Sequence, residues 1–504
     1  MARLLSIPLL ILLAGAAALA MLAPAGLALA YGEYHDARSF FHSALLGFLI
    51  ASLLGIARAG LPNNRNDLRQ LFALLLAFIL LPAMLAVPFH QAVRTTSFLN
   101  AYVEMVSALT TTGATLFAPD RLSMAEHLWR AQVGWMGGLL MWIAAAAILA
   151  PLTLGGFEVT AVSEPGQSMA PGAAHRDKAD PRFRLARAVH GLVPIYLGLT
   201  LALWLLLMVT GDRPFVALCH AMSTMATSGI SPIGGLAQAE SGIWGEAVVF
   251  CFLFFALSRL TFSNDTSAAR RQGLMNDPEF RIGLAIVAAV PLILFARHWV
   301  ASFDVGTEEN IVLGLRAFWG AAFTTLSFLT TTGFESADWT QAQGWSGLDT
   351  PGLILMGLAI IGGGVATTAG GVKLLRVFIL YLNGKRELER LIHPNSVGRS
   401  GLLSRRTRRE GAFIAWVFFM IFALTIAVMV LAFSIQGIPF EGAFVMTIAA
   451  LTNTGPLVAL ATEMPLPLTQ YAPSVKATLA LAMILGRLEV LAIVVMLSPD
   501  LWRD

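Results

Sequence analysis

Residues 107–113 read Ser-Ala-Leu-Thr-Thr-Thr-Gly, and a cluster of the same kind returns three more times along the chain. The later copies are Ser-Thr-Met-Ala-Thr-Ser-Gly at 223–229, Ser-Phe-Leu-Thr-Thr-Thr-Gly at 327–333 and Ala-Ala-Leu-Thr-Asn-Thr-Gly at 449–455. They align without gaps on Gly113, Gly229, Gly333 and Gly455, which lie 116, 104 and 122 residues apart. A single cluster of small residues is ordinary helix packing, so it is the fourfold recurrence in register that predicts an internal repeat.

The composition around these clusters is that of a membrane protein. Of the 504 residues, 57% are hydrophobic and only 12% are charged, and the mean hydropathy is +0.73. A soluble domain carries roughly 25% charged residues, so these values exclude a soluble enzyme, a disordered chain and a fibrous protein. The two cysteines, Cys219 and Cys251, make neither a disulfide framework nor a metal-ligand set.

Apolar stretches of spanning length predict ten transmembrane helices, near 4–22, 39–57, 70–89, 127–151, 186–210, 243–263, 280–302, 351–381, 411–435 and 473–498. The first stretch follows Arg3 and could be a signal peptide, but its length favours a retained helix. Most of the 33 Lys and Arg, among them Arg176, Arg270, Lys373 and Arg376, fall on one side of these helices. The positive-inside rule therefore predicts that the loops on that side and both termini are cytoplasmic.

The loops on the opposite side carry the repeated clusters. Residues 97–117, 214–233, 317–336 and 440–458 are moderately apolar, and we expect them to be too short to span the membrane. A short helix that enters the membrane and turns back explains them, provided that protein buries it or it lines a water-filled cavity. We therefore expect an all-α polytopic membrane protein of four helix–pore-loop–helix repeats in a pseudo-fourfold arrangement, plus two extra N-terminal helices. The expected divisions are residues 1–60 for those two helices and 65–155, 185–265, 279–382 and 409–500 for the repeats.

Four such turns around one axis have the chemistry of an ion filter. Glycine permits backbone conformations that swing carbonyls toward an axis, and rings of carbonyl oxygen can replace the hydration shell of K⁺. Threonine and serine hydroxyls beside the glycines either add ligands or hold the turn. The candidate filter residues, with K⁺ as the bound ion, are Thr111, Thr112, Gly113, Thr227, Ser228, Gly229, Thr331, Thr332, Gly333, Asn453, Thr454 and Gly455.

These motifs resemble the Trk/Ktr/HKT superfamily of potassium transporters, and within it the Trk-type membrane subunits. The resemblance covers roughly residues 65–500 and rests on Thr-Thr-Thr-Gly-Ala-Thr at 110–115, Thr-Thr-Thr-Gly-Phe at 330–334 and Leu-Thr-Asn-Thr-Gly-Pro at 451–456. The second copy departs from the family pattern, because Ile230 follows Gly229 where Gly-Phe is more usual. Glycine at all four filter positions is what the family associates with potassium selectivity, whereas serine at the first would point toward sodium.

The resemblance also implies the setting in which the chain works. It implies a multi-pass protein of the bacterial inner membrane that takes up potassium as a homodimer with one pore in each protomer. It implies a cytosolic nucleotide-binding regulatory subunit, which suits the absence of a nucleotide motif from this sequence. No bound cofactor, no nucleic acid and no enzyme activity are expected, and the lipid bilayer is the other partner.

The stretch 351–381 cannot form one straight helix. It contains Gly-Gly-Gly at 362–364 and Gly-Gly at 370–371, and each glycine inside a helix costs about 1 kcal/mol relative to alanine. A discontinuous helix below the third filter turn predicts an intramembrane loop at 362–373, which resembles the gating loop of the family. Its candidate residues are Gly362, Gly363, Gly364, Thr367, Thr368, Gly370 and Gly371. Close packing of small residues is the alternative; a phosphate-binding loop does not fit, because Val372 separates Gly371 from Lys373.

Arg487 lies inside the last predicted span, where a charge is costly and needs a cavity or a partner. It either pairs with Glu489 or another buried acid, or stands near the pore and helps to hold the gate. Lys476, nearer the outer end, is expected to extend its amine to the surface. Glu104 and His220 hold the same position, nine residues before their glycines, and could pin the pore helices.

Six acids fall in or beside the outer loops and could attract cations to the entrance: Glu104, Asp120, Glu335, Asp338, Glu441 and Glu463. Two other kinds of function stay open at this point. A secondary transporter with its solute site at the broken helix would be expected to show inverted repeats, whereas these copies run in the same orientation. A membrane-embedded enzyme would need clustered His, Asp or Glu at membrane depth.

Overall fold

Helices form nearly all of the regular structure in the computed structural model, which describes residues 8–58, 67–152, 154–157, 181–258, 277–301, 310–346, 351–393, 402–462 and 466–497. No β-strand occurs in these ranges. Eight of their helices are long and apolar enough to cross a membrane: Leu9–Ala30, Tyr34–Arg58, Arg69–Val93, Met124–Leu149, Phe183–Val209, Pro278–Ala296, Val312–Leu329 and Gly411–Ile435. These helices confirm the predicted class, an all-α polytopic membrane protein. Helices suit a membrane because they satisfy their own backbone polar groups in lipid.

Three predicted spans are interrupted in the structure. The span predicted at 243–263 is α11 (Gly242–Leu253) followed by a short 3-10 turn at Phe254–Leu257. The span at 351–381 consists of α16 (Gly352–Ile361) and α17 (Leu374–Ile392), with no helix over 362–373, so the predicted break is confirmed. The span at 473–498 is divided into α21 (Pro473–Leu488) and α22 (Val490–Leu497) by Glu489, whose φ of 60° cannot continue a helix.

Four helices end at the repeated clusters. They are α5 (Phe98–Leu109), α10 (Pro214–Ala226), α14 (Asn310–Leu329) and α19 (Phe440–Leu451). Three of them have 12 or 13 residues, as re-entrant helices should, but α14 has 20. The expectation that the third segment begins near residue 317 and is too short to span is wrong, because apolar residues from Ile311 onward extend the helix toward its N-terminus.

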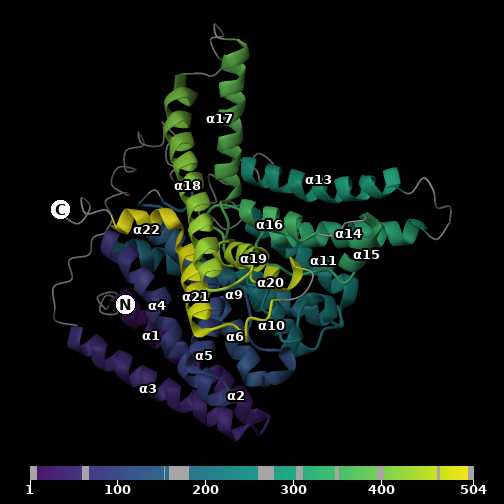
Figure 1. Cartoon of the computed structure of the whole chain (residues 1–504). Coiled ribbons are helices and arrows are strands. Elements are labelled where there is room, and N and C mark those ends of the chain that lie inside the picture. The colour runs from purple at the N-terminus through teal and green to yellow at the C-terminus, as the bar shows by residue number, and fades with distance from the viewer. Residues whose placement is uncertain are drawn as a thin grey trace.

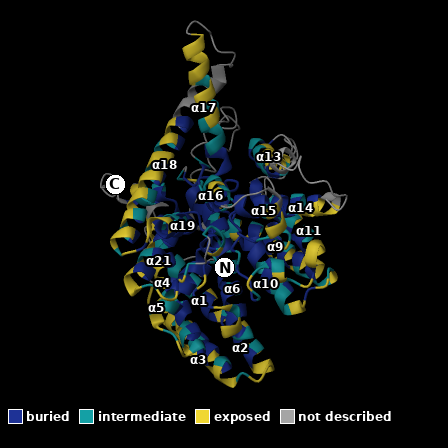
Figure 2. Cartoon of the chain, turned by 45° about the vertical axis from the view of Figure 1, so that its right-hand side comes forward, coloured by how far each residue is buried: buried dark blue, intermediate teal, exposed yellow. Residues whose placement is uncertain are grey.

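These four helices close a circuit with the long helices around them. Each packs against the helix that precedes it, namely α4 (Asp67–Val93), α9 (Pro181–Val209), α13 (Pro278–Ala301) or α18 (Leu402–Ile435). The helix that follows each turn then contacts the short helix of the next unit: α6 (Met124–Ala144) contacts α10, α11 contacts α14, α16 contacts α19, and α21 returns to α5. Figure 2 shows that the interior formed in this way is buried while the outer helices are exposed.

The N-terminal helices stand outside this circuit. Helices α1 (Leu9–Ala20), α2 (Leu22–Ala30) and α3 (Tyr34–Arg58) pack against α4 and α6. On the other side of the molecule, α17 and the first part of α18 extend together beyond the remaining helices (Figure 1). The short helices α15 (Trp339–Ser346) and α20 (Leu457–Leu460) follow the third and fourth turns.

Candidate functional site

The four repeated clusters share one backbone conformation in the residues that precede the glycine. In each, the residue two positions before the glycine is left-handed, with φ of 56° at Thr111, 49° at Thr227, 57° at Thr331 and 55° at Asn453. The main-chain N–H of the next residue donates to the carbonyl five residues earlier in every copy, at 2.8 to 3.0 Å. A non-glycine residue in this region costs on the order of 1–3 kcal/mol, so strain of this kind at four equivalent positions points to a shared requirement.

The four turns contact one another in order. A Cβ added to Gly113 would lie 1.8 Å from the carbonyl oxygen of Ser228 in the second turn. One on Gly229 would lie 2.3 Å from the carbonyl oxygen of Thr332, and one on Gly333 would lie 2.8 Å from the ring of Pro456. The circuit closes between the fourth turn and the first, where the N–H of Gly455 donates to the carbonyl of Thr112 at 2.6 Å. The predicted filter glycines are thus brought together, with a main-chain carbonyl at three of the four contacts and the ring of Pro456 at the contact between the third and fourth turns.

Gly455 is glycine for a different reason from the other three. Gly113, Gly229 and Gly333 have φ of 75°, 65° and 79°, which favours glycine, but Gly455 does not lie in this region. Pro456 follows it and restricts it to an extended conformation. Space still demands glycine there, because a Cβ would lie 2.1 Å from the main-chain nitrogen of Ala114.

The hydroxyls before the glycines hold the turns. Thr112, Thr332 and Thr454 each share a hydrogen bond with the threonine two residues earlier, at 2.8, 3.1 and 3.1 Å. The second turn has Ala226 at that earlier position, and there Ser228 bonds Ser223 at 3.1 Å instead. In the structure these side chains therefore stabilise the backbone of the turn.

The segments that leave the first two turns are held by the residues nine positions before the glycines. Glu104 accepts the N–H of Leu116 at 2.9 Å and pairs with Arg130 at 2.6 Å, with both side chains buried. His220 Nε2 lies 2.9 Å from the hydroxyl of Ser231. Two different side chains at one position thus bind the exit of the turn.

Loop 362–373 has a defined conformation. Gly362, Ala366, Gly371 and Lys373 all have φ between 56° and 84°. The N–H groups of Val372 and Lys373 donate back to the carbonyls of Ile360 and Ile361, so the loop returns along the end of α16. Its first half is held from outside, since the N–H of Gly364 donates to the carbonyl of Ala256 at 2.9 Å and that of Val365 to Glu279 at 3.0 Å.

The second half of the loop contacts three of the four turns. Thr227 donates to the hydroxyl of Thr368 at 3.2 Å, and the N–H of Gly370 donates to the hydroxyl of Thr331 at 2.7 Å. A Cβ on Gly370 would lie 2.0 Å from the carbonyl oxygen of Thr452 in the fourth cluster. The loop is therefore packed directly against the turns. The contact is on the side of the turns where the left-handed residues Thr227 and Thr331 lie.

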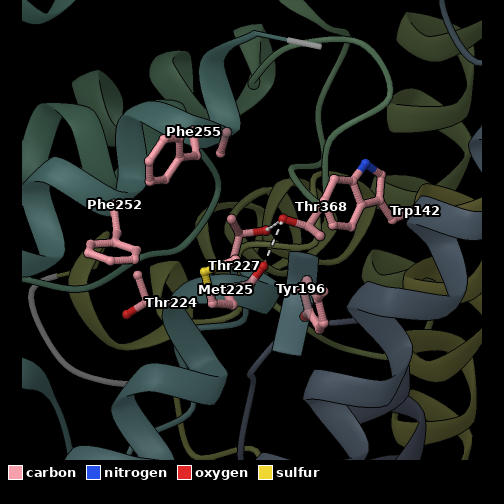
Figure 3. Close-up of a pocket in the computed structure, with 9 residues that line it drawn as sticks. Trp142, Tyr196, Thr224, Met225, Thr227, Phe252, Phe255 and Thr368 are labelled. Atoms are coloured by element: carbon pink, nitrogen blue, oxygen red, sulfur yellow. Dashed lines mark hydrogen bonds between the residues drawn. The ribbon is translucent and has the colours of Figure 1, made fainter. Parts of the chain in front are cut away.

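Figure 3 shows a small cavity beside this contact. Thr227 and Thr368 lie at its centre, between Trp142 and Tyr196 on one side and the rings of Phe252 and Phe255 on the other. Thr224, Met225 and Ala256 complete the lining. These nine lining residues are mostly apolar, and none of them is charged.

Arg487 binds the loop. Its Nη1 donates to the carbonyl of Thr368 at 2.8 Å, and the residue is 5% exposed. The alternative of a salt bridge with Glu489 is wrong, because Glu489 pairs with Arg376 at 2.7 Å. Within the described ranges, Nε and Nη2 of Arg487 have no hydrogen-bond partner and the residue forms no salt bridge, so this guanidinium has no counter-charge there.

Two basic residues expected in a cytoplasmic loop are buried instead. Arg376 is completely buried, lies 3.8 Å from the ring centroid of Phe418 and donates to the carbonyl of Val372. Lys373 donates to the carbonyl of Ala369 within the loop. Arg376 thus joins loop 362–373 to α18 and to the break at Glu489, whereas Lys373 binds within the loop; the sequence revealed neither contact.

Lys476 also differs from expectation. It does not extend to the surface, because its amine donates to Asn100 at 2.9 Å and to the carbonyl of Thr469 at 2.7 Å. Thr469 in turn donates to the carbonyl of Leu116, at the exit of the first turn. Lys476 therefore helps to hold the outer end of the first turn.

The acids in or beside the outer loops differ in their pairing and burial. Glu104 is committed to Arg130 and cannot serve as an attractor at the entrance, whereas Asp120 and Glu441 are exposed. Burial raises the pKa of Glu335, two residues after Gly333, so this carboxyl loses its charge at a higher pH than an exposed glutamate. Glu463 lies outside the described residues, as do basic residues such as Arg176 and Arg270 on which the predicted orientation partly rests. The described residues contain no group of three His, Cys, Asp or Glu that could hold a metal ion.

The chain is similar to known proteins over nearly its whole length. The family profile TrkH, described as a cation transport protein, matches residues 76–503. The Trk system potassium uptake protein TrkH of Vibrio parahaemolyticus is 31% identical over 424 residues, which cover 81% of this chain and 80% of that protein. The protein of the same name from Escherichia coli K12 is 29% identical over 491 residues, or 96% of each chain. The crystal structure of the potassium transporter TrkH from Vibrio parahaemolyticus matches all of both chains with a TM-score of 0.78 at 28% identity.

Proposed function

The chain belongs to the TrkH family of cation transport proteins, and from this premise we propose that it carries K⁺ into the cell. Members of this family are ion transport proteins, so the chain is not an enzyme. The relatives described above are potassium uptake proteins of Trk systems, which supports K⁺ as the transported ion here. The observation that carries the proposal is the circuit of four like turns, each with its glycine against the next turn.

We propose that these turns form the selectivity filter. K⁺ would lose water to carbonyl oxygens on the path lined by Thr111, Thr112, Gly113, Thr227, Ser228, Gly229, Thr331, Thr332, Gly333, Asn453, Thr454 and Gly455. The support is the common backbone conformation and the close approach of neighbouring turns, which leaves no room for a side chain at the glycines. Rings of backbone carbonyls are an established way to replace the hydration shell of K⁺.

We propose that loop 362–373 is the gate, formed by Gly362, Gly363, Gly364, Thr367, Thr368, Gly370, Gly371 and Arg487. In the structure the loop lies against the turns, is tied to them through Thr227 and Thr331, and is tied to α21 through Arg487. Opening requires these bonds to break and the second half of the loop to move, while the bonds of Gly364 and Val365 hold the first half. The positive charge of Arg487 would also oppose passing cations until the loop moves.

The repeat units and the assembly belong to the same proposal. Residues 65–155, 185–265, 279–382 and 409–500 would be four units around one axis, with 1–60 as an added pair of helices. The circuit of helix contacts supports this arrangement. We further propose a homodimer in the bacterial inner membrane with both termini cytoplasmic and a cytosolic nucleotide-binding regulatory subunit, in line with relatives that belong to Trk systems.

Growth and flux test the proposal together. Expression of the chain in a bacterium that lacks its own potassium uptake systems should restore growth at low K⁺, and purified protein in liposomes should pass K⁺ in preference to Na⁺. A secondary transporter of an organic solute would fail both tests. Absence of K⁺ flux from liposomes that contain folded protein, with or without a regulatory subunit, would contradict the proposal.

A further inference from the structure

Glu246 is a buried acid inside the apolar helix α11, and nothing in the function proposed above uses it. The residue is 2% exposed. Its carboxylate accepts three hydrogen bonds: Oε2 from Trp319 Nε1 at 2.9 Å and from the hydroxyl of Ser336 at 2.7 Å, and Oε1 from the N–H of Ala337 at 2.7 Å. No Lys or Arg pairs with it in the described part of the chain. A buried acid at membrane depth is costly, so we expect it to have a role, and the three groups that donate to it indicate that role.

All three donors belong to the third repeat unit, whereas Glu246 belongs to the second. Trp319 lies on α14, the helix that ends at the third turn. Ser336 and Ala337 lie three and four residues after Gly333, on the segment that leaves this turn. Glu246 therefore fixes both the helix before the third turn and the segment after it, from the neighbouring unit.

At the first turn a carboxylate also accepts a hydrogen bond from the segment that leaves the turn, but this carboxylate comes from a different helix. There Glu104 accepts the N–H of Leu116, three residues after Gly113, but it comes from the pore helix of its own unit. At the third turn the equivalent position is Thr324, whose hydroxyl accepts the N–H of Ser336 at a long 3.4 Å. Hydrogen bonds to a carboxylate are shorter and stronger than those to a hydroxyl. Glu246 therefore binds the segment after the third turn more strongly than Thr324 does.

We propose that Glu246 is a positioning residue for ion selectivity, which holds the outer part of the third turn so that its carbonyls stay at the spacing suited to K⁺. This inference rests on the proposed filter. A K⁺ filter discriminates through the number and placement of its carbonyls, so release of one turn out of four should admit Na⁺. Glu246 does not touch the ion; it acts through Ser336, Ala337 and Trp319.

The test compares variants of the full-length protein, purified and reconstituted in liposomes, by the ratio of K⁺ to Na⁺ flux. Glu246→Gln places an amide N–H₂ opposite the N–H of Ala337 or of Trp319, neither of which can accept a hydrogen bond. This loss should lower the ratio of K⁺ to Na⁺ flux roughly tenfold. Ser336→Ala and Trp319→Phe each remove one of the three bonds and should lower it less, roughly two- to threefold. Asp212→Asn is the matched control, since Asp212 is also a buried acid and binds the N–H of Ser241 at the start of α11, away from the turn. It should leave the ratio unchanged.

Two results would overturn the inference. One is a wild-type ratio in Glu246→Gln; the other is an equal fall in Asp212→Asn, which would mean that α11 in general, and not its bonds to the third turn, sets the ratio. If Glu246→Gln does not fold, Ser336→Ala and Trp319→Phe decide, and an unchanged ratio in both overturns the inference. Gly113→Ser in the same assay separates the two levels: if it lowers the ratio and Glu246→Gln does not, only the role of Glu246 fails, whereas no effect of either variant counts against the filter itself.

Discussion

Gly113→Ser is the substitution that strains the proposed filter most. Its Cβ would lie 1.8 Å from the carbonyl oxygen of Ser228, so the first or second turn must move by at least about 1.2 Å to reach the 3.0 Å that real contacts tolerate. The residue would also be held at φ of 75°, which side chains other than glycine rarely adopt. The strain must be relieved by movement of the turns, because the opposing atom is backbone.

The size of the effect follows from this strain. A residue held in such a conformation stores about 1–3 kcal/mol, and that free energy is available to distort the turns. Since about 1.4 kcal/mol corresponds to a factor of ten, the ratio of K⁺ to Na⁺ flux should fall by roughly 5- to 150-fold. Gly229→Ser, with a backbone oxygen at 2.3 Å, should have a comparable effect. Gly333→Ser shares the conformational cost, with φ of 79°, but should lie at the lower end of this range because its Cβ meets the ring of Pro456 at 2.8 Å and no backbone atom.

Liposome flux with opposed K⁺ and Na⁺ gradients measures this ratio directly. Gly198→Ser on α9 is the control, because a Cβ at Gly198 meets nothing within 4 Å. An unchanged ratio in Gly113→Ser would refute the reasoning. So would an equal fall in Gly198→Ser, since that change strains nothing near the turns.

The remaining predictions concern the gate and the buried ion pair. Shortening of loop 362–373 should leave the pore leaky, and a K⁺ flux no higher than wild type would contradict its role. Arg487→Ala removes the bond to the carbonyl of Thr368; a charged hydrogen bond contributes about 1.5–3 kcal/mol, so unregulated K⁺ flux should rise roughly 10- to 150-fold, and no rise would argue against this latch. Glu104→Gln leaves the buried charge of Arg130 unpaired and should cost about 3–5 kcal/mol of stability, seen as a lower melting temperature in detergent. Glu104→Gln combined with Arg130→Met should recover most of that loss, and a double variant as unstable as the single one would show that the pair is not the cause.

Much of this architecture could be predicted from local sequence. The four turns were visible because glycine and threonine recur at one spacing, and the break after Ile361 was visible because five glycines fall within ten residues. The membrane class followed from composition alone. The positions of Glu104 and His220 relative to their glycines indicated a pinning role, and both side chains bind the exits of their turns.

The rest depended on contacts between segments far apart in the chain. Arg376 was taken as one more cytoplasmic basic residue, because nothing local reveals that Glu489 and Phe418 meet it. The partner of Arg487 could not be chosen for the same reason. Glu246 was missed although a signal existed, since a single acid inside an apolar span is unusual enough to mark it. The length of α14 was misjudged because apolar residues before position 317 continue the helix.

The most direct test of the central claim is to locate the ion. Crystals of the protein grown with Tl⁺ or Rb⁺ in place of K⁺ should show anomalous scattering on the path enclosed by Gly113, Gly229, Gly333 and Gly455, within coordination distance of main-chain oxygens of all four turns. Anomalous peaks confined to another part of the molecule, with none between the turns at saturating ion concentration, would contradict the account.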